Sequence, residues 1–276
     1  MTAPKVHRPY STGKIPSVTT ILGVLSKDGL QWAAAKETAM FAVNHRDEWE
    51  TLSDFDAVER LRKHHQGVWD HRAALGTMCH AVNEAWARGE TFDLEDAVVA
   101  LQTGSHVWAK YPTEQLMDEL DVMVDGLERA WNELTPATVA VEDVVRYTDA
   151  EGSYVGSSDW QVRIWGKSFL VDLKTTGRTE PGSALYWDSW RLQLAAYRYA
   201  SEIVDYDGRT EVGTRPLLPV DDTAILHLRM NGEWGFHPVK AGREEHGRFL
   251  DLCRAYRWRL RASKDSGVPQ STGGQQ

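Results

Sequence analysis

The sequence predicts a mixed α/β fold, in which a central mixed sheet is flanked by helices and preceded by a large helical region. Helical spacing of apolar residues dominates up to about residue 134, three segments between 138 and 175 have the pattern of strands, and a second β-rich pair begins at residue 224. The chain has 276 residues, 42% of them hydrophobic, which is enough for one sizeable core. We therefore expect one folded unit.

Composition divides the chain into four regions. The first residues carry two prolines and a glycine, and the last are rich in Ser, Gly and Gln, so both ends are expected to lack fixed structure. Between them, helical patterns give way to strand patterns after Thr135-Pro136. The expected regions are a flexible N-terminus (1–15), a helical region packed on the core (16–135), the α/β core (136–262) and a disordered tail (263–276).

The helical region is predicted to contain a short first helix and at least two longer elements. Ser17 or Thr19 provides an N-cap hydroxyl for the first helix. Residues 54–88 are expected to form one or two helices. A further helix is predicted over 114–134, where the apolar residues that recur at helical spacing are Leu116, Leu120, Met123, Leu127 and Trp131.

Three consecutive strands are predicted at 138–147, 153–164 and 168–175. In the third, apolar residues alternate with Asp172 and Lys174, so these two side chains share one face of the strand. An acid and a lysine two residues apart are also common on an exposed strand. This strand is rich in Leu, Val and Phe, however, and a charge in such a strand is costly unless it is paired or bound to a metal.

The reversal between the second and third strands sets the expected register. With Gly166 and Lys167 as a two-residue turn, Asp159 pairs directly with Lys174, and Asp172 becomes its diagonal neighbour. Diagonal Cβ atoms lie roughly 7 to 8 Å apart, close enough for both carboxylates to reach one cation. The hairpin therefore carries the groups that a metal-dependent phosphodiesterase needs.

The rest of the chain completes the expected core. A helix is predicted over 187–201, and residues 207–219 read as a loop with Gly and Pro. A hairpin is expected from 224–228 and 234–239, joined by a type I′ turn at Asn231-Gly232, and a helix from Glu244 to about Leu260 follows.

Four short motifs, taken in order, resemble those of the RecB-like branch of the PD-(D/E)XK nucleases, which includes phage and CRISPR-associated exonucleases. The clear part of the resemblance spans residues 76–200, and each motif is weak alone, while the ordered set is fairly specific. The matching segments are Gly76–His80, Gly156–Asp159, Asp172–Lys174 and Gln193–Tyr197, and Pro16–Leu22 is similar to the opening of phage members.

The resemblance implies a PD-(D/E)XK core and a metal-dependent active site. Asp159, Asp172 and the backbone carbonyl of Leu173 would bind Mg²⁺ or Mn²⁺, with His80 as a nitrogen ligand and Glu142 as a secondary ligand candidate. A helical polar pair of His80 with a nearby acid, and an exposed strand carboxylate at position 142, remain open alternatives. Lys174 would hold the attacking water, and Gln193 and Tyr197 would face the site. Candidate DNA contacts are Arg191, Arg198, Thr175 and Thr176.

The implied function is a DNA exonuclease in phage-type recombination, repair or processing. The alternatives are a structure-specific endonuclease and a nucleic-acid-binding scaffold without cleavage. The expected partners are DNA, a recombination partner protein and further copies of the chain. A net charge of −9 opposes nonspecific DNA binding, so a local basic surface is required. The two cysteines, Cys79 and Cys253, are too few for the iron–sulfur cluster that part of the family carries.

Targeting signals do not stand out in the sequence. It contains no run of 18 apolar residues, and its N-terminus lacks the apolar segment of a signal peptide. We therefore expect no membrane insertion and a cytoplasmic location, in the host cytoplasm if a phage encodes the protein.

Overall fold

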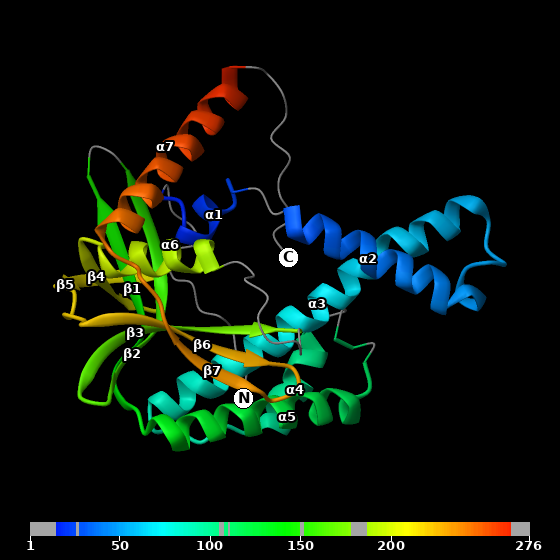
Figure 1. Ribbon diagram of the computed structural model, residues 1–276, viewed down its shortest axis with the longest axis horizontal. Coiled ribbons are helices and arrows are strands. Elements are labelled where there is room, and N and C mark those ends of the chain that lie inside the picture. The colour runs from blue at the N-terminus through cyan, green and yellow to red at the C-terminus, as the bar shows by residue number, and fades with distance from the viewer. Residues whose placement is uncertain are drawn as a thin grey trace.

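A seven-stranded mixed sheet lies at the centre of the protein, with helices on both of its faces (Figure 1). This arrangement confirms the predicted fold class. The computed structural model describes residues 15–25, 28–104, 108–109, 111–149, 152–177 and 187–265. The expected flexible N-terminus, apart from Ile15, and the tail beyond Asp265 lie outside the described residues.

The sheet has the strand order β5-β4-β1-β2-β3-β6-β7. All neighbouring strands are antiparallel except β3 and β6, which are parallel. A parallel pair needs a crossover connection, and the segment between these two strands carries α6. The strands are β1 (Ala137–Thr148), β2 (Ser153–Ile164), β3 (Lys167–Thr176), β4 (Glu202–Asp207), β5 (Thr210–Arg215), β6 (Asp222–Arg229) and β7 (Trp234–Pro238).

The five predicted helical segments are all helical, and the segment at 54–88 forms a single helix. Helices at 28–44 and 94–104 are not predicted individually, and the last helix extends to Asp265, into the expected tail. The Ser17 side chain caps the first one by accepting a hydrogen bond from the Thr20 N–H at 3.1 Å, as expected. The helices are α1 (Val18–Leu22), α2 (Asp28–Asn44), α3 (Asp54–Ala87), α4 (Leu94–Gly104), α5 (Thr113–Leu134), α6 (Trp187–Arg198) and α7 (Arg243–Asp265), with a 3-10 turn at Arg46–Glu48.

Two apolar clusters hold the helices against the sheet. The larger one joins α3, α4 and α5 to one face of β2, β3 and β6, with Trp160, Val171 and Leu173 pointing into it. The smaller one joins α1, α6 and α7 to the opposite face, where Leu170 and Ile225 contribute. The alternation of Leu170, Val171 and Leu173 between the clusters follows from the two-residue period of a strand. Figure 1 shows these two helical layers above and below the sheet.

The predicted register of the β2–β3 hairpin is wrong by two residues. Trp165 and Gly166 have positive φ angles of 50° and 76°, which makes them the two central residues of the turn, and Ile164 pairs with Lys167. A type I′ turn requires positive φ at both central positions and favours glycine at the second. Gly166 therefore takes the second position of the turn, and not the first as the sequence pattern predicts.

The connection between β6 and β7 is also not the predicted type I′ turn. Only Gly232 has a positive φ, of 77°, and its N–H donates to the Arg229 carbonyl at 2.9 Å. The Arg229 N–H in turn donates to the Glu233 carbonyl at 2.8 Å, which closes a three-residue loop. Such loops end with a residue in the left-handed region, so Gly232 alone explains the sequence signal.

The expected loop at 207–219 contains the edge strand β5, which pairs with β4. Most of β5 is exposed, and its one large apolar residue, Val212, is 63% exposed. A strand exposed on both faces has no apolar alternation, so its sequence gives no strand pattern.

No helix among the described residues is both long and apolar enough to cross a bilayer.

Candidate metal centre

The strands β2 and β3 separate where the predicted acids lie. Their ladder runs from the pair Ile164–Lys167 to the pair Trp160–Val171 and ends there, although both strands continue. At the next position the Asp159 carboxylate accepts a hydrogen bond from the Leu173 N–H at 2.9 Å. A side chain therefore replaces the backbone partner that β3 has lost. Asp159 therefore does not lie opposite Lys174. The predicted register requires that pairing, but the turn at Trp165-Gly166 shifts the register by two residues and the ladder ends at Trp160–Val171.

Glu142 lies on β1 at the same level as Asp159. Its neighbours Val141 and Asp143 pair with Trp160 and Ser158, the two neighbours of Asp159. Glu142 and Asp159 therefore lie between the same two residue pairs of the β1–β2 ladder. Glu142 has a positive φ of 54°, a conformation that costs a non-glycine residue about 1 to 3 kcal/mol and that clusters at functional sites. Burial and the negative charge of Asp159 raise the pKa of Glu142 to about 8, although its carboxylate accepts a hydrogen bond from the Ser157 hydroxyl at 2.7 Å.

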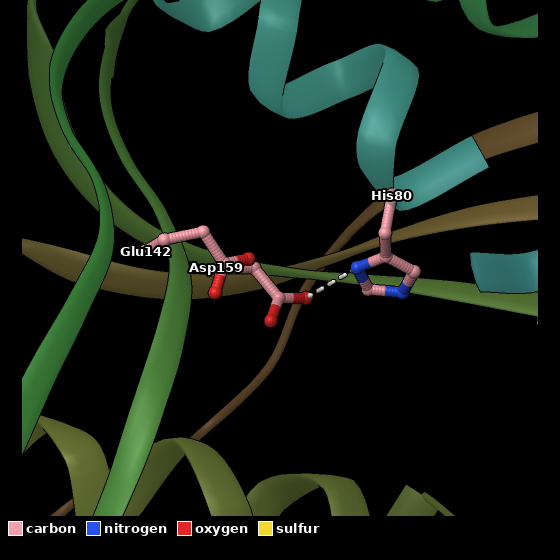
Figure 2. Close-up of side chains that lie close together, drawn as sticks. All are labelled: His80, Glu142 and Asp159. Carbon is pink, nitrogen blue, oxygen red and sulfur yellow. Dashed lines mark ion pairs between the residues drawn. The ribbon is translucent and has the colours of Figure 1, made fainter. Parts of the chain in front are cut away.

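His80 approaches the two acids from α3. Its Nδ1 lies 3.5 Å from Asp159 Oδ2, and one ligand atom each of His80, Glu142 and Asp159 lie within 4.8 Å of one another. Figure 2 shows the three side chains converging from α3, β1 and β2. Burial and the positive charge of Lys174 lower the pKa of His80 to about 4, so its imidazole is neutral at neutral pH. A neutral imidazole is the form that binds metal ions.

Asp172 and Lys174 lie beside this group on β3. Asp172 is 1% exposed, and its Oδ2 forms an ion pair with Lys174 Nζ but accepts no well-directed hydrogen bond from the described residues. Burial raises the pKa of Asp172 to about 6, and the Lys174 ammonium only partly offsets that effect. Asp172 is thus a buried carboxylate whose two oxygens are bound by Lys174 and Gln193.

Gln193 on α6 links Asp172 and Lys174. Its Nε2 donates to Asp172 Oδ1 at 3.1 Å and to the Tyr197 hydroxyl at 3.1 Å, while its Oε1 accepts from Lys174 Nζ at 3.2 Å. The amide therefore fixes the carboxylate and the ammonium relative to each other. The polar face of α6 points to the acids, as the resemblance implies.

Two glycines allow the helices to come this close to the sheet. A Cβ at Gly156 would lie 2.6 Å from Cε1 of Tyr197, so Tyr197 packs directly on the backbone of β2. A Cβ at Gly76 would collide with Oγ1 of Thr175, so α3 packs directly on β3 one turn before His80. Each predicted motif glycine thus makes room for a side chain from another motif or strand.

The other predicted site residues are placed apart from the acids. Arg191 donates to the Lys240 carbonyl at 2.9 Å and to buried Glu245 at 2.7 Å, and Arg198 donates to the Asp221 carbonyl at 3.0 Å. A DNA contact by either arginine would compete with these bonds. Thr176 shares a hydrogen bond of 2.8 Å with His227 Nε2. Cys79 and Cys253 are buried in the two apolar clusters.

Two further residues lie beside residues of the site although the sequence does not predict them. Ser157 holds Glu142, and its position inside the Gly156–Asp159 motif could have drawn attention to it. His227 lies next to Lys174 in the parallel β3–β6 register, and no local pattern marks it because that pairing is long-range.

The donor set suits a divalent cation. His80, Glu142 and Asp159 place one neutral imidazole and two carboxylates within 4.8 Å of one another, and hard oxygen donors with one nitrogen suit Mg²⁺ or Mn²⁺. Asp172, the third predicted carboxylate, lies outside this group, and its two oxygens are bound by Lys174 and Gln193. The residues present therefore fit the implied metal.

Comparisons with known proteins add little to this description. No protein-family model matches the chain, and no curated protein matches it. A solved structure titled "Crystal structure of SSO0001" is similar over 73% of this chain and 97% of its own, at 13% sequence identity and a TM-score of 0.32. This similarity is too weak to carry an argument about fold or function.

The raised pKa of Glu142 predicts a pH-dependent gain in stability for Glu142→Gln in the absence of metal. An acid whose pKa is higher in the folded than in the unfolded state costs stability as pH rises above 4.5, and this cost is complete only above about 8. In EDTA we expect the variant to melt about 3 °C or more above the wild type at pH 8.5, and to gain less at pH 5.5. The measurement is thermal unfolding by circular dichroism.

The matched control for this experiment is Glu133→Gln, at an exposed position on α5. It should change the melting temperature little at either pH. An equal gain for Glu142→Gln at both pH values would show that repulsion and burial do not raise the pKa of Glu142.

The contact between Gly156 and Tyr197 predicts that Gly156→Ala is destabilising. The added methyl group cannot fit without moving α6, and overpacking of this kind costs about 1 to 3 kcal/mol. Urea unfolding measures the loss. Gly213→Ala on β5 is the control, since a Cβ added there would meet nothing within 4 Å, and it should be close to neutral. In a double-mutant cycle, a much smaller cost of Gly156→Ala in a Tyr197→Ala background than in the wild type would assign the loss to this contact.

Proposed function

We propose that this protein is a metal-dependent deoxyribonuclease of the RecB-like PD-(D/E)XK kind, acting as an exonuclease. The observation that carries the proposal is the convergence of four ordered motifs on one place, the point where β2 and β3 separate. His80, Glu142 and Asp159 form one half of the site, and Asp172, Lys174 and Gln193 form the other half. Polar residues from five different elements rarely converge in this way unless they share a ligand or a reaction.

The proposed metal ligands are His80, Asp159, Asp172, the Leu173 carbonyl and Glu142. When bound there, Mg²⁺ or Mn²⁺ would supply Lewis-acid stabilisation of a phosphoryl oxygen and a more acidic water. The protein contributes the placement of these ligands. The Leu173 N–H holds the Asp159 carboxylate at 2.9 Å, and Ser157 holds that of Glu142 at 2.7 Å, so neither needs to reorganise.

Lys174 is the proposed group for the water and the scissile phosphate. Asp172 and Gln193 hold the Lys174 ammonium. Because the side chain is 20% exposed, the ammonium still reaches the surface. There it can donate a hydrogen bond to the attacking water or to a phosphate oxygen, which needs a compact cation with several donors. Gln193 keeps the ammonium in place, and the Tyr197 hydroxyl keeps Gln193 in place.

The proposed substrate is linear DNA, digested from an end, in phage-type recombination, repair or processing in a cytoplasm. The alternatives are a structure-specific endonuclease with the same site and a scaffold that binds nucleic acid without cutting it. The presence of both acids and Lys174 favours cleavage over the scaffold. Recombination partners and assembly with further copies belong to the proposal only through the family resemblance.

The test is cleavage of end-labelled linear DNA and covalently closed circular DNA in Mn²⁺, Mg²⁺ or EDTA. We expect the wild type to degrade the linear DNA alone, only with metal, and Asp172→Asn and Lys174→Met to lose at least about 100-fold in rate. Lys167→Met, at an exposed lysine in the same hairpin, is the matched control and should retain full activity.

The outcomes separate the three candidates. Cutting of the circular DNA would favour the endonuclease, and DNA binding without any cleavage in either metal would leave the scaffold. Cleavage that persists in Asp172→Asn would refute the assignment of the active site.

A further inference from the structure

A second hollow lies on the β6–β7 hairpin, outside the group of acids. It has a volume of about 380 Å³, within the range of pockets that hold small ligands. The hairpin supplies most of its lining and α5 supplies one arginine. The lining residues are Arg129, His227, Arg229, Gly232, Glu233, Trp234, Gly235 and His237.

The sheet places this hollow next to Lys174. In the parallel β3–β6 pair, Lys174 is the partner of His227 and Thr176 is the partner of Arg229. Partners in a ladder project to the same face, and adjacent strands are about 4.8 Å apart. Thr176 binds His227 Nε2 at 2.8 Å, and the His227 ring lies 6.1 Å from Trp190 on α6, so His227 is on the face that carries Lys174 and Gln193. The hollow thus begins one strand away from the proposed reaction centre.

The two histidines of the hollow are fixed by the backbone around them. His227 on β6 pairs with Gly235 on β7, and His237 lies 6.2 Å from it, ring centre to ring centre. A Cβ at Gly235 would lie 2.5 Å from Nε2 of His237, so the His237 ring lies over the glycine backbone. Any side chain at position 235 would push this ring away. Gly235 therefore leaves room for the His237 ring at the hollow.

The hollow has donors for an anion and an aromatic face. Arg129 Nη2 donates to the Gly232 carbonyl at 2.8 Å, and Arg229 pairs with Glu233, so two guanidinium groups and one carboxylate line the hollow. Burial lowers the pKa of His227 and His237, and the charge of Arg229 lowers both further. A neutral imidazole has one N–H donor and one acceptor nitrogen, and His227 uses its Nε2 with Thr176. Trp234 adds an indole that is partly exposed and otherwise packs against the larger apolar cluster.

We propose that this hollow is a subsite for one nucleotide of the substrate strand, with its phosphate on Arg129 and Arg229 and its base on Trp234. Guanidinium groups suit phosphate oxygens, and stacking of a base on an aromatic ring favours binding of single strands whatever the base. Phosphate binding competes with Glu233 for Arg229. The inference rests on the proposed nuclease function, because the subsite would hold the strand whose neighbouring phosphodiester lies at Lys174.

The first experiment is titration of the full chain with dTMP in EDTA, where no cleavage can occur. Protein with ¹³C-labelled histidine reports binding through the ring signals of His227 and His237, with His45, which lies far away in the chain and is exposed, as an internal control. We expect millimolar dTMP to shift the signals of His227 and His237 and to leave His45 unchanged. Thymidine and inorganic phosphate are titrated separately and should each shift them less than dTMP.

Two charge variants with opposite expected effects test the role of the hollow. Binding of fluorescein-labelled dT8 in EDTA should weaken at least about fivefold in Arg229→Gln, which loses the donor, and tighten about threefold in Glu233→Gln, which loses the competitor. Damage to the fold would not tighten binding. The matched control Arg163→Gln, at an exposed site on β2, should change binding less than about twofold.

The results distinguish this subsite from the nuclease function. Absence of any His227 or His237 shift with millimolar dTMP, or an equal shift with inorganic phosphate alone, would overturn the nucleotide subsite even if the wild type cleaves DNA. Shifts with dTMP and opposite effects of the two variants would support the subsite, and a wild type that fails to cleave would then refute the nuclease function alone.

Discussion

The hydrogen bond from the Leu173 N–H to the Asp159 carboxylate is the contact on which the candidate site depends. It lies at the end of the β2–β3 ladder and supplies an acceptor that the backbone of β2 no longer provides. A strand N–H left unpaired in the interior would cost about 1 to 3 kcal/mol, so the acid both ends the pairing and stabilises the gap. Opening the sheet at this point gives side chains from both faces access to the same space.

Helices on opposite faces use that access. The apolar cluster around α3 brings His80 to Asp159 from one side, and the cluster around α6 brings Gln193 to Asp172 from the other. Burial of apolar side chains supplies most of the energy for both approaches, because Leu75 and Leu194 are fully buried and each contributes about 1.5 to 3 kcal/mol. The polar groups of the site are thus positioned by packing that lies outside it.

The sequence predicts the elements of this site better than their geometry. Strand alternation locates β1, β2 and β3 to within one residue at each end, since their apolar residues face two distinct clusters. The prediction of the register fails because the position of Gly166 within its turn depends on how the whole hairpin twists. The strand β5 is not predicted because it is exposed and has no buried face to impose an apolar pattern on its sequence. His227 could not be found because its neighbour Lys174 is more than fifty residues away in the chain.

The site is electrostatically unfavourable without a cation. Burial and mutual repulsion raise the pKa values of Glu142 and Asp172, although Lys174 lies against Asp172. The strained φ of Glu142 adds a further cost. Lys174 offsets the charge of Asp172 only in part, while Glu142 and Asp159 share their space with a neutral His80. Under the proposed function, a divalent cation would offset the cost of ionising these acids, so the arrangement that weakens the metal-free fold is the one that would favour a metal.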